Sequence, residues 1–323
     1  MTNPDHGNEQ SAHEQDTIDI SLANPRGFCA GVDRAIEIVK HALSRFGAPV
    51  YVLHEIVHNR HVLADLSQRG AIFVKRLDQV PPGSVTIFSA HGVAKEVVQE
   101  ASERSLQVID ATCPLVTKVH VQASNYASKD HDIVLIGHEG HPEVEGTRGQ
   151  IEGTVHVLST IEEVNALEVQ DPNQVAYVTQ TTLSVDDTRE VIDALMARFP
   201  AIQGPALKDI CYATQNRQNA VREMVHEVEL LLVVGSANSS NSNRLAELGE
   251  RSGVESYLVD HPDQVKAEWF DGKTQIGVTA GASAPETLLR EILDRIKDFG
   301  VTTVREIDGE PETVVFNMPP ELC

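Results

Sequence analysis

The sequence has no apolar run of roughly 18 residues or more, about the least that a membrane-spanning helix needs. Its first residues are polar and acidic, whereas a secretory signal begins with a basic segment and continues with an apolar one. We therefore expect no membrane span and no secretory signal, and we predict a cytoplasmic protein. Residues 1–17 also lack apolar periodicity, which is typical of a disordered extension.

The sequence is also poor in positive charge. It has 26 lysines and arginines against 48 aspartates and glutamates, which gives a formal net charge of -22. Nucleic-acid binding requires a basic surface that neutralises phosphates, so this balance argues against a nucleic-acid partner. We expect the acidic excess to be a solvated surface, and any anionic ligand must then be held by local hydrogen-bond donors.

Cysteines are few, and none lies in the close C-x-x-C pairs that structural zinc sites commonly use. The four cysteines are separated by long stretches, unlike the disulfide framework of a small secreted domain. Three of them, Cys29, Cys113 and Cys211, share one pattern: a strand-like segment, the cysteine, then apolar residues at helical spacing. A cysteine at a helix N-terminus suits a metal ligand or a nucleophile, because the helix dipole favours the thiolate.

Further polar residues recur at corresponding positions after each of these cysteines. At nearly the same separation, a polar residue closes an apolar segment that we interpret as a strand, over 50–57, 133–137 and 230–235. These residues are His58, His141 and Ser239, and a second strand end in each unit carries His91, Thr181 and Ser283. Such repetition indicates three copies of one structural unit.

Strands that alternate with helices predict parallel sheets, which bind ligands at the carboxyl ends of their strands. We therefore predict an α/β fold of three pseudo-threefold related units with mainly parallel sheets, arranged as a trefoil around a central cavity. The predicted units are residues 30–112, residues 113–210, and residues 211–300 together with a strand over 18–29, followed by a C-terminal tail over 301–323.

Three cysteines that meet at one centre can hold an iron–sulfur cluster through three of its irons and leave one iron open to substrate. Their matched positions argue against the alternative that Cys29, Cys113 and Cys211 are only small buried apolar residues. Zinc bound by three thiolates is a second alternative. Cys323 matches no unit, and we expect it to take no part.

A second group of candidates consists of neutral or titratable hydrogen-bond donors. Hydroxyls, amides, imidazoles and helix N-termini can hold a diphosphate without a metal, and histidines that titrate near neutrality can carry compensating charge. The candidates are His58, His91, His141, Thr181, Ser239, Ser240, Asn241 and Ser283. The run over 239–243 also fits a plain helix cap and turn. We expect the other central histidines behind the site or at the surface: His54, His61, His120 and His138.

One carboxyl group stands out as a candidate for proton transfer. Glu143 follows His141 by two residues, in a turn expected from Pro142 and Gly146. A carboxyl group there can move protons if its pKa is raised or if a hydroxyl such as that of Thr181 relays the proton. Two other carboxyl groups, Glu139 and Glu145, are rivals, and the register of the repeat favours Glu143.

Eight stretches of the sequence resemble the motifs of one enzyme family. They are Asn24-Pro-Arg-Gly-Phe-Cys29-Ala-Gly-Val-Asp-Arg, Ser89-Ala-His91-Gly-Val, Asp110-Ala-Thr-Cys113-Pro-Leu-Val-Thr-Lys-Val-His, Gly137-His-Glu-Gly-His141-Pro-Glu143-Val-Glu-Gly-Thr, Thr179-Gln-Thr-Thr-Leu-Ser, Asp209-Ile-Cys211-Tyr-Ala-Thr, Gly235-Ser-Ala-Asn-Ser239-Ser-Asn-Ser-Asn-Arg and Val278-Thr-Ala-Gly-Ala-Ser283-Ala-Pro. Together they look like the 4-hydroxy-3-methylbut-2-enyl diphosphate reductases, which catalyse the last step of the methylerythritol phosphate route to isoprenoids. The resemblance covers residues 18–300 or so.

The resemblance implies a trefoil around one [4Fe-4S] cluster bound by Cys29, Cys113 and Cys211, with one open iron for the substrate's hydroxyl. It implies that Thr181 helps to place the hydroxyl and that Glu143 supplies protons. The residues implied to hold the diphosphate are His58, His91, His141, Ser239, Ser240, Asn241 and Ser283. The implied reaction is a two-electron reductive dehydroxylation that gives isopentenyl or dimethylallyl diphosphate, with a flavodoxin or a ferredoxin as the electron donor.

Two other classes of function remain open at this stage. A zinc-dependent hydrolase would use cysteines and histidines around one metal ion. A non-catalytic iron–sulfur sensor or scaffold would have no open iron and would not need Glu143.

Overall fold

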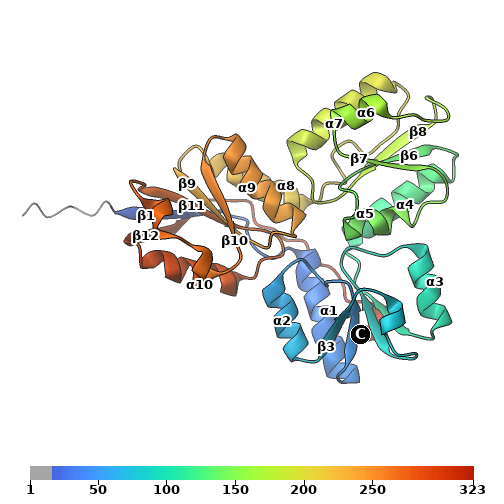
Figure 1. Cartoon of the computed structure of the whole chain (residues 1–323), viewed down its shortest axis with the longest axis horizontal. Helices are drawn as coiled ribbons and strands as arrows, with labels where there is room; N and C mark the ends of the chain where they lie inside the picture. The colour runs from blue at the N-terminus through green and yellow to red at the C-terminus, as the bar shows by residue number, and fades with distance from the viewer. Residues whose placement is uncertain (1–16) are drawn as a thin grey trace, which may run out of the picture.

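The computed structural model describes residues 17–323, which form three parallel β-sheets with helices packed around them (Figure 1). All strand pairs in these residues are parallel, which confirms the predicted α/β class with three sheet-based units. The predicted extension over 1–17 lies, apart from its last residue, outside the described residues. Among the helices of residues 17–323, none is long and apolar enough to cross a membrane.

The first unit, blue to cyan in Figure 1, is a four-stranded sheet in the order β3-β2-β4-β5. Its strands are β2 (Val50–Leu53), β3 (Ala71–Val74), β4 (Val85–Phe88) and β5 (Gln107–Asp110). Its helices are α1 (Ala30–Phe46), α2 (Arg60–Gln68), η1 (Leu77–Gln79) and α3 (Lys95–Glu103).

The second unit, green to yellow, is a three-stranded sheet in the order β7-β6-β8. Its strands are β6 (Asp132–Ile136), β7 (Val155–Leu158) and β8 (Val175–Thr179). Its helices are α4 (Pro114–Ala127), α5 (Pro142–Arg148), α6 (Ile161–Ala166) and α7 (Val185–Arg198).

The third unit is a five-stranded sheet in the order β10-β9-β11-β1-β12, so its strands come from both ends of the described chain. Its strands are β1 (Ile18–Leu22), β9 (Leu230–Val234), β10 (Glu255–Val259), β11 (Gln275–Ala280) and β12 (Val301–Glu306). Its helices are α8 (Tyr212–Met224), α9 (Ser240–Arg251), η2 (Pro262–Gln264), η3 (Ala267–Phe270) and α10 (Glu286–Lys297).

The segment expected as a C-terminal tail has two parts. Its first part is β12, which pairs with β1 at the edge of the third sheet. The chain then returns to the first unit, where Met318 and Leu322 of the final segment, which contains η4 (Pro320–Leu322), pack beside α1. The final segment therefore connects the third unit to the first. The exact borders of the three units stay a prediction.

The central strands β6 and β9 are buried on both faces, which is why they are nearly continuous apolar runs. In β9, the side chains alternate between two apolar clusters: Leu230 and Leu232 pack on one face and Leu231 and Val233 on the other. The same alternation divides Ile133 and Val134 of β6 between two clusters. The carboxyl ends of the strands are directed at the centre of the molecule (Figure 1).

Three expected strands differ from the structure. The strand expected over 18–29 ends at Leu22 of β1. β2 ends at Leu53, and residues 54–59 form an irregular turn in which His54 has a positive φ of 63°. No strand precedes Cys211; the chain there follows β8 only through a single bridge between Ala176 and Gln203. Each of these segments leads to a residue that lines the central cavity, so the chain leaves the direction of the neighbouring strand before it could pair further.

Candidate active site

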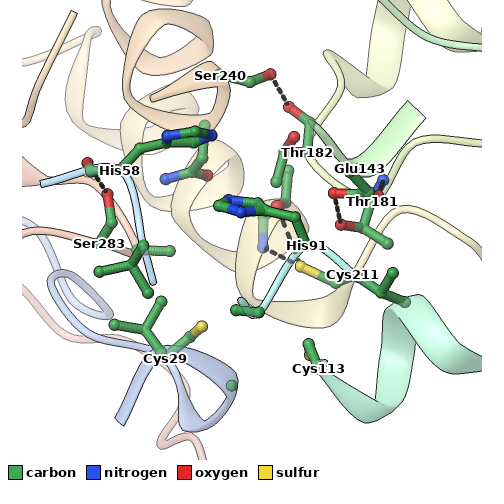
Figure 2. A pocket seen from close by; sticks show the side chains of 18 of the residues that line it. Cys29, His58, His91, Cys113, Glu143, Thr181, Thr182, Cys211, Ser240 and Ser283 are labelled. Atoms are coloured by element: carbon green, nitrogen blue, oxygen red, sulfur yellow. Dashed lines mark hydrogen bonds between the residues drawn. The ribbon is translucent and has the colours of Figure 1, made fainter. Parts of the chain in front are cut away.

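A cavity lies where the three units meet (Figure 2). All twelve predicted site residues line it: Cys29, His58, His91, Cys113, His141, Glu143, Thr181, Cys211, Ser239, Ser240, Asn241 and Ser283. The four histidines that we expected behind the site or at the surface, His54, His61, His120 and His138, do not line it. The repeat in the sequence thus corresponds to one place in the fold.

Each of the three cysteines is the N-cap of a different helix, Cys29 of α1, Cys113 of α4 and Cys211 of α8. Their backbone N–H groups donate to corresponding carbonyl groups, those of Ala282 (3.3 Å), Ala90 (3.0 Å) and Thr181 (3.1 Å). The second polar residue of each unit is at the acceptor position or next to it: Ser283 follows Ala282, His91 follows Ala90, and Thr181 is itself the acceptor. Each cysteine is therefore held beside one of these polar residues. This geometry follows the threefold pattern of the sequence.

The thiols are buried, and burial outweighs the helix dipole in setting their pKa values. Burial raises the pKa of Cys113 to about 12 and that of Cys211 to about 11, and it raises the pKa of Cys29 as well. Backbone N–H groups at the helix N-termini lower these pKa values, as we expected, but burial has the larger effect. These sulfur atoms need a nearby positive centre before they lose their protons.

The space between the cysteines fits a group larger than a single ion. A Cβ atom on Gly31 would lie 2.8 Å from Sγ of Cys113 and 3.8 Å from Sγ of Cys29, so the absence of a side chain keeps these two sulfurs clear. Within residues 17–323, no three His, Cys, Asp or Glu side chains are close enough together to hold one metal ion. Three soft sulfur donors around a wider space suit an iron–sulfur cluster better than zinc.

The three histidines form one cluster on another wall of the cavity. The ring centroids of His58 and His91 are 4.2 Å apart, and the ring of His141 lies 5.4 Å and 5.8 Å from them. Burial and the neighbouring imidazoles lower the pKa of His141 to about 4 and that of His91 well below its usual value. At neutral pH, His91 and His141 are therefore neutral and do not carry the compensating charge that we expected of some histidines.

Two hydrogen bonds orient these rings. Nδ1 of His141 accepts from the N–H of Glu143 at 3.1 Å, so the proton of the neutral ring is assigned to Nε2. Nδ1 of His58 lies 2.9 Å from the carboxylate of Glu55, while its buried Nε2 has no partner among the described residues. Glu55 was not among the predicted site residues, although its position three residues before His58 is a usable signal.

The N-terminus of α9 supplies the hydroxyl and amide groups. Ser239 caps the helix and lies 3.2 Å from Ser283, oxygen to oxygen, and Ser240 donates to the carbonyl of Thr182 at 3.1 Å. Asn241 is only 3% exposed, and neither polar atom of its side chain has a hydrogen-bond partner in the described part of the chain. A buried amide without partners costs free energy, so this cradle is built for a polar ligand.

Glu143 is the buried carboxyl group of the site. Its Oε1 accepts from the N–H of Thr181 at 2.6 Å and its Oε2 from the hydroxyl of Thr181 at 3.0 Å (Figure 2). Burial raises its pKa to about 7, although the two hydrogen bonds act in the opposite direction. The rivals Glu139 and Glu145 are exposed and do not line the cavity.

Sequence reasoning missed two lining residues with polar side chains, Thr182 and Thr214. Thr214 donates from its N–H to the sulfur of Cys211 at 3.4 Å, and its hydroxyl lies 3.1 Å from that sulfur. The carbonyl of Thr182 accepts from Ser240. Thr214 sits three residues after a helix-capping cysteine, where a cap contact is usual, whereas the role of Thr182 depends on tertiary packing.

Comparison with known proteins gives one consistent family. The model of the LytB protein family matches residues 20–297. The chain is 58% identical over 310 residues to the 4-hydroxy-3-methylbut-2-enyl diphosphate reductase of Xanthomonas axonopodis pv. citri, with 94% of this chain and 98% of that protein covered. It is also 58% identical to the reductase of that name from Acinetobacter baylyi, with the same coverage.

Solved structures agree with this result. The structure of E-1-hydroxy-2-methyl-but-2-enyl-4-diphosphate reductase from Plasmodium falciparum superposes with a TM-score of 0.91 at 37% identity, and the match covers 95% of this chain and 97% of that one. Because the family model spans most of the sequence and the relatives are matched over nearly their whole length, the chain belongs to the LytB protein family.

Proposed function

We propose that this chain is the reductase that converts (E)-4-hydroxy-3-methylbut-2-enyl diphosphate to isopentenyl diphosphate and dimethylallyl diphosphate. The relatives at 58% identity carry the name of that reductase, and another structural neighbour, at a TM-score of 0.62 and 30% identity, is described as the terminal enzyme of the non-mevalonate pathway. The observation that carries the proposal is the single cavity in which three cysteines face an anion-binding cradle and a buried carboxyl group.

Cys29, Cys113 and Cys211 would hold the cofactor, one [4Fe-4S] cluster with three cysteine ligands and one open iron. When bound, the cluster supplies single electrons and a Lewis-acidic position at the open iron for the substrate's hydroxyl. The chain's own contribution is to keep three sulfurs directed at one point and to exclude other ligands. Gly31 supports this, because any side chain there would enter the space between two of the sulfurs.

The polar cradle would bind the diphosphate. Neutral His91 and His141 donate N–H groups, and the N-terminus of α9 adds its dipole and backbone N–H groups. Asn241 gains the partners that its buried amide lacks, and the free Nε2 of His58 can turn to the ligand. The complete set is His58, His91, His141, Ser239, Ser240, Asn241 and Ser283.

Glu143 would supply the protons, and Thr181 would orient both this carboxyl group and the substrate's hydroxyl. The reaction consumes two electrons and two protons: the C–O bond breaks, the hydroxyl leaves as water with one proton, and a carbon of the allyl group takes the other. A carboxyl group with a pKa of about 7 can hold such a proton near neutral pH and release it. We propose a flavodoxin or a ferredoxin as the source of electrons.

The test is an anaerobic reconstitution with iron and sulfide, followed by oxidation of a reduced viologen when hydroxymethylbutenyl diphosphate is added. We expect about four irons per chain and substrate-dependent oxidation, with both lost in Cys211→Ser and retained in Cys323→Ser. Cys323 is exposed and lies outside the cavity, so it is the matched control. A full cluster without turnover would indicate a sensor, and zinc in place of iron would contradict the role given to the three cysteines.

A further inference from the structure

Each cysteine-capped helix carries a cationic side chain five or six residues after the cysteine. On α1 this residue is Arg34, which donates to the carbonyl of Thr112 at 3.1 Å and to that of Ala111 at 3.4 Å. Thr112 immediately precedes Cys113. A side chain on the helix of the first cysteine thus holds the backbone that leads into the second.

The helix of the second cysteine repeats the arrangement. Lys118 of α4 donates to the carbonyl of Lys208 at 2.9 Å and lies 3.5 Å from the carboxylate of Asp209. These two residues come just before Cys211. The side chain of Asp209 is fully buried, whereas that of Lys118 is about half exposed, so the contact pairs an inward carboxylate with a surface cation.

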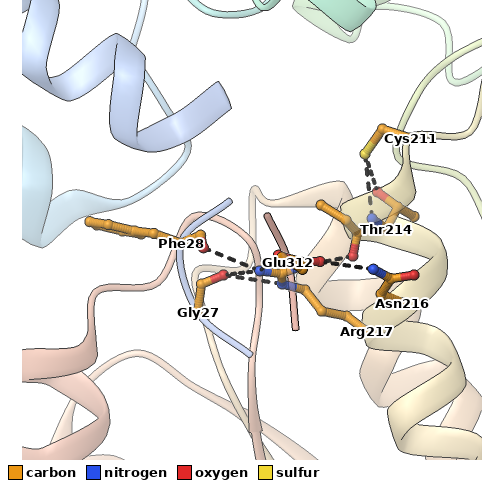
Figure 3. A network of polar contacts seen from close by, with 8 residues as sticks. Gly27, Phe28, Cys211, Thr214, Asn216, Arg217 and Glu312 are labelled. Atoms are coloured by element: carbon orange, nitrogen blue, oxygen red, sulfur yellow. Dashed lines mark hydrogen bonds and ion pairs between the residues drawn. The ribbon is translucent and has the colours of Figure 1, made fainter. Parts of the chain in front are cut away.

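The helix of the third cysteine closes the circle (Figure 3). Arg217 of α8 is completely buried and donates two hydrogen bonds to the carbonyl of Gly27, at 2.7 Å and 3.1 Å, and one to that of Phe28 at 3.2 Å. Phe28 immediately precedes Cys29. The three contacts therefore run from the first cysteine to the second, from the second to the third, and from the third back to the first.

The C-terminal segment supports two of these side chains. Glu312 accepts from Arg217 at 2.9 Å and 3.2 Å and from Asn216 at 3.1 Å, which gives the buried guanidinium its counter-charge. The carbonyl of Asn317 accepts from Nε of Arg34 at 2.7 Å. The segment that joins the third unit to the first thus contacts two of the three cations on its way.

We propose that Arg34, Lys118 and Arg217, which we call the cationic ring, are positioning residues that set the spacing of the three cluster-binding sulfurs. The proposal rests on the cluster assigned under the proposed function. Each unit begins with the helix that one cysteine caps and ends with the segment just before the next cysteine. The contact from that helix to that segment, Arg34 to Thr112, Lys118 to Lys208 and Arg217 to Gly27, therefore fixes the two cysteines at the ends of the unit relative to each other. The same contact recurs with different side chains in all three units, which points to a shared requirement.

The experiment compares Arg34→Met, Lys118→Met and Arg217→Met with the matched controls Lys129→Met and Arg222→Met. Lys129 is an exposed lysine just beyond α4, and Arg222 of α8 pairs with Asp186 away from the cysteines. Reconstituted proteins are exposed anaerobically to an iron chelator, and the decay of the iron–sulfur absorbance is followed. The circular dichroism of each metal-free protein and the electron paramagnetic resonance spectrum of each reduced cluster are recorded in parallel.

We expect the ring variants to lose the cluster at least about tenfold faster than the wild type, as is usual when groups that orient metal ligands are removed. Their cluster spectra should change while the metal-free proteins keep native circular dichroism, and both controls should behave as the wild type. Since Lys118 and Arg34 lie near the surface, their variants keep the test valid even if Arg217→Met unfolds. If Arg34→Met and Lys118→Met lost the cluster at the wild-type rate and had unchanged spectra, the role proposed for the cationic ring would be wrong. A wild-type protein that binds no iron and sulfide would instead overturn the proposed function, and the ring with it.

Discussion

Both carboxylate oxygens of Glu143 are held by a single residue, Thr181, through its backbone N–H and its hydroxyl. Glu143 is 3% exposed, and the turn that carries it is fixed by the N-cap contact from its own N–H to His141. This pair connects the segments that follow two neighbouring strands of the second unit, β6 and β8. For the proton transfer that we propose, it fixes the position of the carboxyl group.

Replacing the carboxyl group by an amide should stop proton delivery and leave the cluster in place. We expect Glu143→Gln to lower kcat by a factor on the order of 100 or more, the usual contribution of a general acid. Iron and sulfide content should equal that of the wild type. Glu145→Gln, an exposed change on the same helix, is the control and should keep full activity. Equal losses in both variants would contradict the assignment.

The pH dependence of turnover should follow the pKa of Glu143, which is about 7. Below that pH the group carries its proton, and above it the proton is lost, so kcat should fall as the pH rises through about 7. The hydrogen bonds from Thr181 stabilise the charged carboxylate and lower this pKa. Thr181→Val removes the hydroxyl donor, so the falling limb should move to higher pH. Anaerobic pH profiles of kcat for both proteins check this, and a shift to lower pH would be the contrary result.

Asn241 should show opposite effects on stability and on substrate binding. Because neither polar atom of its amide has a partner within the described residues, Asn241→Leu removes a buried polar group at little cost to folding. We expect an unchanged or higher free energy of unfolding for the metal-free protein. KM should rise by a factor of about 5 to 150, the loss of roughly 1–3 kcal/mol of hydrogen bonding to the diphosphate.

The matched control for this prediction is Asn243→Leu on the same helix. Asn243 donates to the carbonyl of Ala237 and does not line the cavity, so the change should cost about 1 kcal/mol of stability and leave KM as it is. If both variants had the same KM as the wild type, Asn241 would have no part in binding the diphosphate.

Gly31→Ala should separate folding from cluster binding. Alanine is the better helix former by roughly 0.5–1 kcal/mol, so the metal-free protein should not lose stability. The added methyl group, however, would lie 2.8 Å from Sγ of Cys113 and must displace that sulfur. We expect a lower iron and sulfide content after reconstitution, measured beside a thermal melt of the metal-free protein. Full cluster content would show that the cysteine side chain adapts.

The sequence predicted which residues come together more closely than it predicted the local backbone. The repeat of Cys29, Cys113 and Cys211 and the polar residues after them led to the parallel α/β class and to twelve residues that line one cavity. The prediction succeeded because a strand-to-helix junction can be recognised from local sequence, and because the carboxyl ends of parallel strands lie at the same edge of a sheet. Residues 54–57 and the segment before Cys211 were mistaken for strands, since their apolar residues are buried without regular pairing.

By itself, the sequence determined the three units, the type of sheet, the cysteines that cap the helices and the family to which the chain belongs. Only the tertiary structure decided the electrostatics and the connections between units. Burial, which no local pattern encodes, raises the pKa of Glu143 to about 7, lowers that of His141 to about 4 and raises the pKa values of the three unliganded thiols. The contact of Arg217 with Glu312 and Gly27 joins residues far apart in the chain, so it exists only once the two ends of the third unit and the C-terminal segment have packed together.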